Sequence, residues 1–273
     1  MVRFDFAMEA IAQADAMLIT AGAGMGVDSG LPDFRGNVGF WSAYPSLAQL
    51  GLLFSEIASP KWFTKDPELV WGFFGHLLGL FRATVPHEGF QLLLDAAKRM
   101  PAGYFVVTSN IDGQFQKAGF DEARISEMHG SIHTLQCSEP CHQEIWSADG
   151  VSVDVDMTAC RATSEFPACP RCGAIARPNI LMFSDSDWIG HPSYKQHAAF
   201  EAWMDSLRGK RLVIIECGAG TAIPTIRWIS SSAERKPDAT LIRINPRDSE
   251  VAEGQISIPA GALAGISQII RPA

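Results

Sequence analysis

The strongest constraint on the fold is a short apolar run, residues 16–20, that passes directly into a glycine-dense loop. An uninterrupted apolar run of this length is typical of a strand buried on both faces of a parallel sheet. Gly22, Gly24 and Gly26 follow the run. Glycines at such a point let the backbone and its N–H groups approach a pyrophosphate closely. The segment therefore predicts a dinucleotide pocket in an α/β protein.

The continuation of this loop differs from that of an ordinary dehydrogenase. In a dehydrogenase, an acidic residue about 20 positions further on would hold the ribose. Here that place is taken by a Pro-Asp-Phe-Arg-Gly turn at residues 32–36, followed by Phe40 and Trp41. Glycines after a strand can also mark only a tight strand-to-helix turn. It is the continuation that favours a loop folding over a ligand.

Length and composition limit the class of protein. The chain has 273 residues, of which 47% are hydrophobic, enough for one large domain and a smaller module. A net charge of −8 and a pI near 5.3 argue against a nucleic-acid partner, which would normally require a basic face, but allow a basic peptide partner. We find no signal-peptide core and no apolar run as long as a membrane span. We therefore expect a cytoplasmic protein with no membrane partner.

Strand-like runs alternate with helical stretches over most of the chain, which predicts a Rossmann-like, doubly wound parallel sheet. Further strands are expected at residues 103–108, 124–130, 179–183, 211–216 and 240–244. Helices are expected at residues 6–14, 89–100, 194–207 and 225–235. We assign the Rossmann-like domain to residues 1–41, 86–136 and 177–273, a helical module of several short helices to 42–85, and a small inserted module to 137–176.

The inserted module contains two close cysteine pairs in a stretch too polar to fold around its own core. The pairs are Cys137 with Cys141 and Cys169 with Cys172. Four thiolates in this arrangement predict a structural, tetrahedral zinc site. Cys160 is an alternative ligand without a close cysteine partner, and we expect His142 to be exposed. Incidental reduced cysteines are the other interpretation, but they would not usually have a proline beside each pair.

Polar or glycine-rich positions follow several of the other expected strands. Asn110 and Asp112 follow one strand, the Gly218-Ala219-Gly220 loop follows another, and Asn245 ends a third. The carboxyl ends of parallel strands form the ligand crevice of an open sheet. Each position could be only a turn, but together with the first glycine loop they indicate a ligand lying across the sheet.

The motifs now identify a family resemblance that covers nearly the whole chain. The matching segments, in order, are AGAGMGVDSGLPDFRG, TSNIDGQFQKAG, EMHGSIHTLQC, the two cysteine pairs, RPNILMF, the glycine loop at 218–220, and IRIN. In these segments the chain resembles a sirtuin of the bacterial type. The resemblance implies a zinc module and a helical module beside a Rossmann-like domain, with NAD and zinc as cofactors.

The resemblance also assigns residues. His129, in the Glu-Met-His-Gly motif, matches the catalytic histidine. Asn110 and Asp112 match the residues at the nicotinamide ribose and the nicotinamide amide, and Asn245 matches the residue at the adenosine ribose. The other implied cofactor-binding residues are Gly22, Ala23, Gly24, Asp33, Phe34, Arg35, Ser109, Ile111, Gly218, Ala219 and Gly220. A histidine alone would more often be a core residue, and the motif around His129 favours catalysis.

Four departures from the family pattern affect both the cofactor loops and the substrate edge. The family usually has serine at Gly26, glutamine at Ser109 and Gly-Thr-Ser at 218–220. Its Phe-Gly-Glu segment is replaced by Phe183-Ser184-Asp185. These changes remove hydroxyl and amide groups, so we expect weak NAD binding that a serine at position 26 would strengthen.

The resemblance implies an NAD-dependent protein-lysine deacylase that transfers the acyl group to ADP-ribose, with an acyl-lysine peptide as partner. In that reaction a general base must activate a ribose hydroxyl, which imidazole can do near neutral pH. Sirtuins that remove acidic acyl groups carry a Tyr-x-x-Arg pair, which aligns with Phe74 and Leu77, so an uncharged acyl group is expected. An NAD glycohydrolase, an ADP-ribosyltransferase and a non-catalytic NAD or ADP-ribose sensor remain as alternatives.

Overall fold

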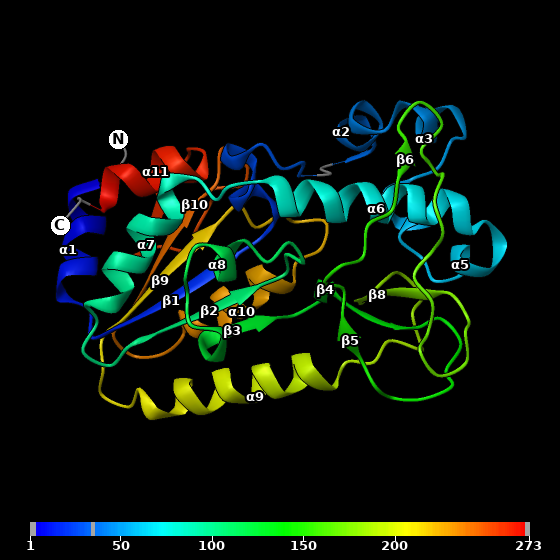
Figure 1. Ribbon diagram of the computed structural model, residues 1–273. Helices are drawn as coiled ribbons and strands as arrows, with labels where there is room; N and C mark the ends of the chain where they lie inside the picture. Colours follow the sequence, from blue (N-terminus) through cyan, green and yellow to red (C-terminus); the bar gives the residue numbers. More distant parts are fainter. Residues whose placement is uncertain (1–3, 34–35, 271–273) are drawn as a thin grey trace.

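Six parallel strands form the central sheet of the computed structural model, which describes residues 4–33 and 36–270 (Figure 1). Their order across the sheet is β11-β10-β9-β1-β2-β3. The strands are β1 (Ala16–Ala21), β2 (Tyr104–Thr108), β3 (Ile125–Glu127), β9 (Leu212–Cys217), β10 (Ala239–Ile244) and β11 (Ile256–Ile258). All five neighbouring pairs are parallel, which confirms the predicted α/β sheet.

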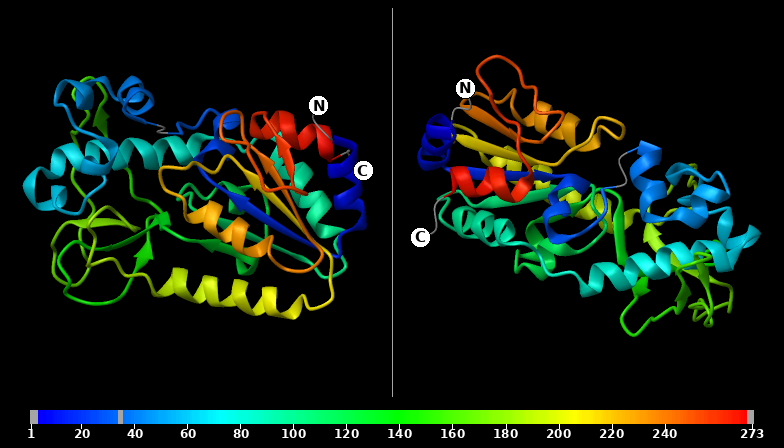
Figure 2. Two further views of the ribbon diagram at one scale, coloured as in Figure 1. Left: turned by 180° about the vertical axis from the view of Figure 1, so that it is seen from behind. Right: turned by 90° about the horizontal axis from the view of Figure 1, so that it is seen from above.

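Helices cover both faces of this sheet (Figure 2). One face packs against α1 (Phe4–Gln13), α7 (Glu88–Lys98) and α11 (Ala262–Ile269), and the other against α9 (His191–Ser206) and α10 (Thr225–Ala233). Every residue of β1 and β9 is buried, because both faces are covered. This burial explains why these two strands are mostly apolar, with Thr20 and Glu216 as their buried polar residues.

The order of the strands places a ligand crevice at the centre of the sheet. Along the chain the sheet grows from β1 through β2 to β3, and then restarts on the other side of β1 with β9. Such a reversal opens a crevice at the carboxyl ends of the two central strands. The glycine loops that begin at Gly22 and Gly218 directly follow β1 and β9.

The second part of the molecule combines the helical segment with the cysteine-rich segment. Its helices are α2 (Gly36–Ala43), α3 (Pro45–Gln49), α4 (Phe54–Ile57), α5 (Trp62–Lys65) and α6 (Pro67–Ala83). Its strands are β4 (Gly130–Cys137), β5 (Trp146–Ser147), β6 (Val155–Asp156), β7 (Arg161–Ala162) and β8 (Ala176–Ile180). One hydrophobic core joins side chains of both segments, including Trp71 and Cys160. The polar segment therefore folds against the helices.

Three features differ from the sequence-based expectations. The long helix α6 has 17 residues, where only short helices were expected. The strand expected at 179–183 is β8, which ends at Ile180 and pairs antiparallel with β4 instead of joining the parallel sheet. The edge strand β11 and helix α11 were not predicted; β11 has only three residues, which is too short for a recognisable pattern.

The remaining short elements connect these parts. They are α8 (Gln114–Lys117) and the 3₁₀ turns Ala23–Met25, Val27–Ser29 and Glu122–Arg124. Among the residues that the structure describes, no single helix has the length and apolar character of a membrane span. Taken together, α6 and α7 are long and apolar enough for a membrane span by length and composition alone, but the two helices are bent by 64° relative to each other.

Candidate functional site

A cavity of about 630 Å³ lies at the carboxyl ends of β1, β2 and β9 and extends to α6 and β8. It brings together most of the predicted site residues. Those that line it are Gly22, Ala23, Asp33, Ser109, Asn110, Ile111, Asp112, His129, Gly218 and Gly220. Gly24, Ala219 and Asn245 are not part of its lining, and Phe34 and Arg35 lie outside the described residues.

The two glycine loops at one end of the cavity pack directly against each other. A Cβ atom on Gly22 would lie 2.8 Å from the Cα of Ala219, and one on Gly218, whose φ is +62°, would lie 2.3 Å from the carbonyl carbon of Gly24. The Gly22 N–H donates to Cys217 and the Gly24 N–H to Gly218, at 3.0 and 3.1 Å. These two N–H groups are therefore engaged within the protein. Glycine is required here for the close approach of the loops.

Asn245 is hydrogen-bonded to the second glycine loop. Its side chain is fully buried, and Nδ2 donates to the Ala219 carbonyl at 2.9 Å. Its Oδ1 accepts from the N–H groups of Arg247 and Asp248, both at 3.1 Å. Arg247 in turn pairs with Asp33 at 3.0 Å. Asn245 thus fixes the loop at 218–220, and the Arg247–Asp33 pair connects it to the loop after β1.

Asn110 is held at the ends of β1 and β2. Thr108 Oγ1 donates to the Ala21 carbonyl and accepts from the Asn110 N–H, both at 3.0 Å. Asn110 Nδ2 donates to the Gly22 carbonyl at 3.1 Å. These bonds fix the amide side chain at the point where two strands end.

Asp112 lies deeper in the same loop and is buried. Its Oδ1 accepts from the Gln114 N–H at 3.0 Å, which begins α8. Burial raises the pKa of Asp112 to about 6, and hydrogen bonds to the carboxylate oppose the rise. The Asp112 carbonyl interacts with His133 Nε2 at 3.0 Å. Asp112 is therefore a hydrogen-bond acceptor at neutral pH and a proton donor in acid.

His129 faces the same cavity from the turn between β3 and β4. Burial lowers its pKa below the ordinary value, and a hydrogen bond with the Ser109 backbone opposes the shift. The His129 carbonyl accepts from the Leu181 N–H at 2.9 Å, which joins the turn to the end of β8. The imidazole is neutral at pH 7 and can accept a proton.

A buried acid two residues before His129 was not singled out from the sequence. Glu127 is 7% exposed, and burial raises its pKa to about 7, against the effect of hydrogen bonds with Gln116 and Gln196. Its N–H also donates to Gln196 Oε1 at 2.9 Å. Because the partners lie on α8 and α9, this network becomes visible only in the folded chain.

The end of the cavity nearest α6 is apolar. Phe74 and Leu77 line it, as expected from the alignment of this helix. They are joined by Leu53, Phe54, Phe81, Ile180 and Met182. No lysine or arginine among the described residues lines the cavity. Arg82, the nearest cation along the helix, donates instead to the carbonyls of Ala148 and Val151.

The segment Leu181–Phe183 forms one rim of the cavity and is anchored by a buried ion pair. Arg177 contacts both oxygens of Asp185 at 2.7 and 2.9 Å, and the two side chains are 1% and 0% exposed. Asp185 also accepts from the Met182 N–H at 3.2 Å. Asp185 therefore holds the rim in place and does not itself face a ligand.

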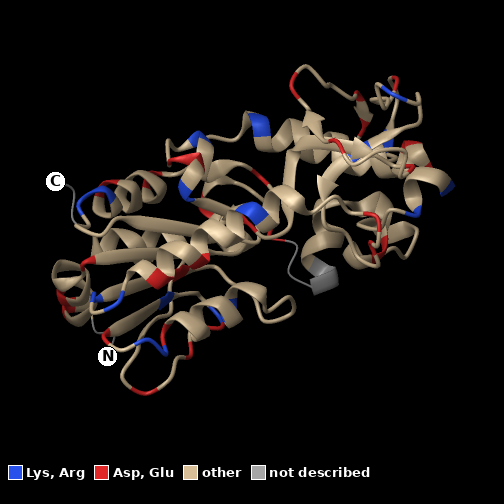
Figure 3. Cartoon of the chain, turned by 90° about the horizontal axis from the view of Figure 1, so that it is seen from below, with Lys and Arg blue, Asp and Glu red and all other residues tan. Residues whose placement is uncertain are grey.

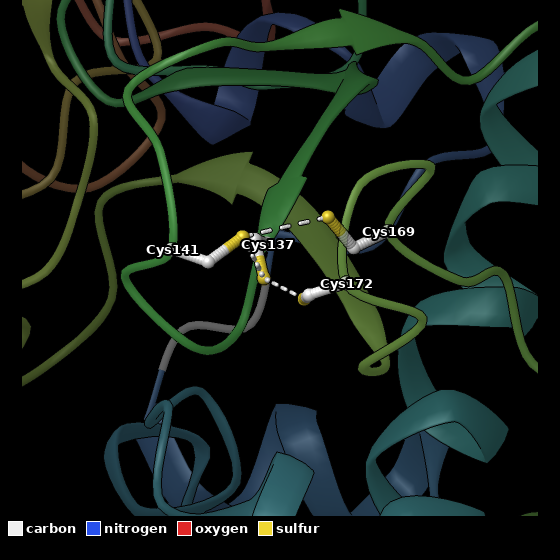
Figure 4. A group of neighbouring side chains, drawn as sticks. All are labelled: Cys137, Cys141, Cys169 and Cys172. Carbon is white, nitrogen blue, oxygen red and sulfur yellow. Dashed lines mark hydrogen bonds between the residues drawn. The ribbon is translucent and has the colours of Figure 1, made fainter.

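The four predicted zinc ligands meet in one cluster (Figure 4). The Sγ atoms of Cys137, Cys141, Cys169 and Cys172 lie within 4.8 Å of one another, and three of the Sγ–Sγ distances are 3.5 to 3.7 Å. Tetrahedral zinc with bonds of about 2.3 Å would separate its sulfur ligands by about 3.8 Å, so the cluster fits the ion. Cys160 is fully buried elsewhere and is not part of the cluster.

His142 is buried, and the expectation that it is exposed is wrong. Its Nδ1 accepts from the Glu144 N–H at 3.0 Å, so the ring proton lies on Nε2. That Nε2 is 3.2 Å from Cys169 Sγ, to which it donates. A thiolate that accepts such a bond is oriented by it. Apart from the adjacency of His142 to Cys141, no sequence pattern predicts this contact.

Known proteins resemble this chain over most of its length. The model of the Sir2 family matches residues 22–201. An NAD-dependent protein deacylase of Aeropyrum pernix is 28% identical over 244 residues, which cover 88% of this chain and 85% of the relative. A solved Sir2 homologue in complex with NAD has a TM-score of 0.67 at 20% identity, covering 97% of this chain and 92% of its own. A Sir2 protein bound to an acetylated peptide has a TM-score of 0.65 at 17% identity, covering 98% and 97%.

Proposed function

Because the chain belongs to the Sir2 family, we propose that it is an NAD-dependent protein-lysine deacylase acting on uncharged acyl groups. One observation carries the proposal. A single cavity joins the glycine loops at the centre of the sheet, the side chains of Asn110, Asp112 and His129, and an apolar end formed by α6. A dinucleotide and an acyl-lysine can therefore reach the same histidine.

The residues of the cavity fit NAD, because Gly22 and Gly218 line its end at the centre of the sheet and the polar side chains of Asn110 and Asp112 line the same cavity. When bound, NAD supplies the ribose that receives the acyl group as nicotinamide leaves. Asn110 and Asp112 bind and orient the nicotinamide ribose and amide, Asp112 as an acceptor above pH 6 or so. His129, neutral at pH 7, accepts a proton from a ribose hydroxyl.

Zinc has a structural part in this proposal. Four thiolates fill the tetrahedral shell, so no position remains for substrate. The cluster stabilises the segment that packs against α6, and α6 forms one wall of the cavity. The ion therefore supports the site without taking part in the reaction.

The apolar end of the cavity supports the choice of an uncharged acyl group. Phe74 and Leu77 offer no charge to a distal carboxylate, and Arg82 is occupied by backbone carbonyls. Burying an unpaired carboxylate costs several kcal/mol, whereas an alkyl chain gains from burial. Acetyl and longer apolar chains are the groups that this surface can accept.

We also propose that nucleic acid is not a partner. The net charge of −8 supports this proposal, and acidic and basic residues are interspersed along both parts of the chain (Figure 3). A nucleic-acid-binding surface usually concentrates basic residues on one face.

The alternative of an NAD glycohydrolase or transferase loses one argument. That argument is the altered substrate edge, where Ser184-Asp185 replaces the Gly-Glu of the family pattern. Asp185 is fully buried with Arg177.

Incubation with NAD and an acetyl-lysine peptide, with the products identified by mass spectrometry, tests the assignment. Deacetylated peptide with acetyl-ADP-ribose supports it. Nicotinamide release without peptide would indicate a hydrolase. ADP-ribose left on protein would indicate a transferase, and the absence of nicotinamide release would indicate a sensor.

A further inference from the structure

Helix α6 separates the apolar end of the cavity from the cysteine-rich segment. At 100° per residue, Phe74, Leu77 and Phe81 share one face of the helix, and all three line the cavity. Gly72, Gly75 and Gly79 fall on the opposite face. That face contacts β6 and β7, and β6 lies beside the helix in Figure 1. Any change in the spacing between α6 and these strands therefore acts on the cavity wall.

At two of the three glycines, α6 lies so close to the cysteine-rich segment that a Cβ atom would not fit. A Cβ atom on Gly72 would lie 2.1 Å from the carbonyl oxygen of Cys160, and one on Gly75 would lie 2.9 Å from the Cβ of Val153. Ordinary contacts begin near 3.4 Å. A Cβ atom on Gly79 would meet nothing within 4 Å. The first two positions thus require glycine for the close approach, and the third does not.

The cysteine-rich segment is tied to α6 along its whole length, so it cannot simply move away. Arg161 pairs with Asp66 before the helix, with both contacts at 2.9 Å. Trp71 Nε1 donates to the Ala176 carbonyl at 3.1 Å, and Arg82 donates to the Ala148 carbonyl at 2.7 Å near the end of the helix. The opposite face of α6 meets the open cavity. A side chain added on the glycine face would therefore push the helix toward the cavity.

We infer that Gly72 and Gly75 determine how long an acyl chain the site accepts, although neither residue touches the substrate. The inference rests on the proposed deacylase function, in which the apolar end of the cavity receives the acyl group. A shift of α6 by about half an ångström, the amount that Gly75→Ala requires, narrows the space between Phe74 and the facing side chains. Long chains fill that space and acetyl does not, so long chains lose most.

The test compares kcat/KM for one peptide carrying acetyl-, butyryl-, hexanoyl- and decanoyl-lysine, each normalised to acetyl. Gly75→Ala should lower the ratio for the longest chain that the wild type processes by at least about tenfold, on the scale of a methylene that no longer fits a pocket. Gly79→Ala is the matched control, because it adds the same methyl group to the same face where space is open. Its ratios should equal those of the wild type.

Two further variants separate this inference from general destabilisation. The methyl group of Gly72→Ala meets backbone atoms, so this variant should lower the long-chain ratios more than Gly75→Ala does. If Gly72→Ala fails to fold, Gly75→Ala alone decides the question. Adding Val153→Gly to Gly75→Ala removes the atom that the new methyl group meets, and should restore the wild-type ratios.

The inference would be overturned if Gly75→Ala had the same chain-length ratios as the wild type, or if adding Val153→Gly did not restore the ratios that Gly75→Ala lowers. Either result would leave the deacylase function intact. A wild type that removes no acyl group would refute the proposed function, and the inference with it.

Discussion

The buried ion pair beneath the rim of the cavity allows a quantitative stability prediction. Asp185→Asn keeps the shape of the side chain but leaves the Arg177 guanidinium, 1% exposed, without a counter-charge. Breaking a buried pair by removing one partner typically costs about 3–5 kcal/mol. With a slope of about 3 kcal/mol per M urea, the midpoint of unfolding should fall by about 1 M or more.

Two controls isolate the effect of burial. Glu68→Gln removes a contact with Arg161 of 3.2 Å in which the side chains are 61% and 40% exposed, so it should cost less than about 1 kcal/mol. The double variant Arg177→Met with Asp185→Leu removes both charges and should be far closer to the wild type than Asp185→Asn.

Equilibrium urea denaturation followed by tryptophan fluorescence and by circular dichroism measures all three variants. Because an amide has a single acceptor oxygen, Asp185→Asn cannot accept from both Arg177 nitrogens and from the Met182 N–H, so the rim should be held less firmly and KM for the peptide should rise. A loss no larger than that of Glu68→Gln would refute the reasoning about this pair.

The remaining predictions concern the metal, the proton, the acyl group and the cofactor. Cys137→Ser should lower bound zinc well below one ion per chain, measured by plasma mass spectrometry, and full retention of the ion would contradict the assignment. The pKa of Asp112 is about 6, and the pKa of His129 is below its ordinary value. We therefore expect kcat/KM to rise through about pH 6 and to level off near pH 7. A rise centred above pH 7 would contradict these pKa shifts. Acetyl-lysine should be preferred over succinyl-lysine on one peptide by about a hundredfold or more, corresponding to about 3 kcal/mol for an unpaired buried carboxylate, and a succinyl preference would be decisive against the apolar pocket. Contrary to the expectation from sequence, Gly26→Ser should weaken NAD binding in calorimetry. The new Cβ atom would lie 3.0 Å from the side chain of Leu31, which lines the cavity. Tighter binding would contradict this prediction and show that Leu31 moves aside.

The parts of the site that could be predicted from the sequence are those encoded by local patterns. The apolar run of β1 and the glycines after it follow one another directly in the chain, so strand, loop and crevice could be predicted together. The two cysteine pairs are similarly local, and their convergence on one cluster follows from the chemistry of thiolates.

The parts that could not be predicted depend on contacts between distant segments. Gly72 and Gly75 let α6 lie close to the cysteine-rich segment, and this contact joins segments far apart in the chain, which no local pattern shows. Burial of Asp185 depends on β8 joining the antiparallel sheet, which brings Arg177 beneath the rim. The position of His142 depends on Cys169, which follows 27 residues later.

The central claim is that one cavity couples NAD cleavage to lysine deacylation through His129. Its most direct test is the ratio of nicotinamide released to acetyl groups removed, measured by chromatography in the same reaction with and without acetyl-lysine peptide. We predict a one-to-one ratio with peptide, no release without it, and loss of deacetylation in a His129→Ala variant that retains its zinc. Equal nicotinamide release in the absence of peptide, or wild-type deacetylation by His129→Ala, would contradict the account.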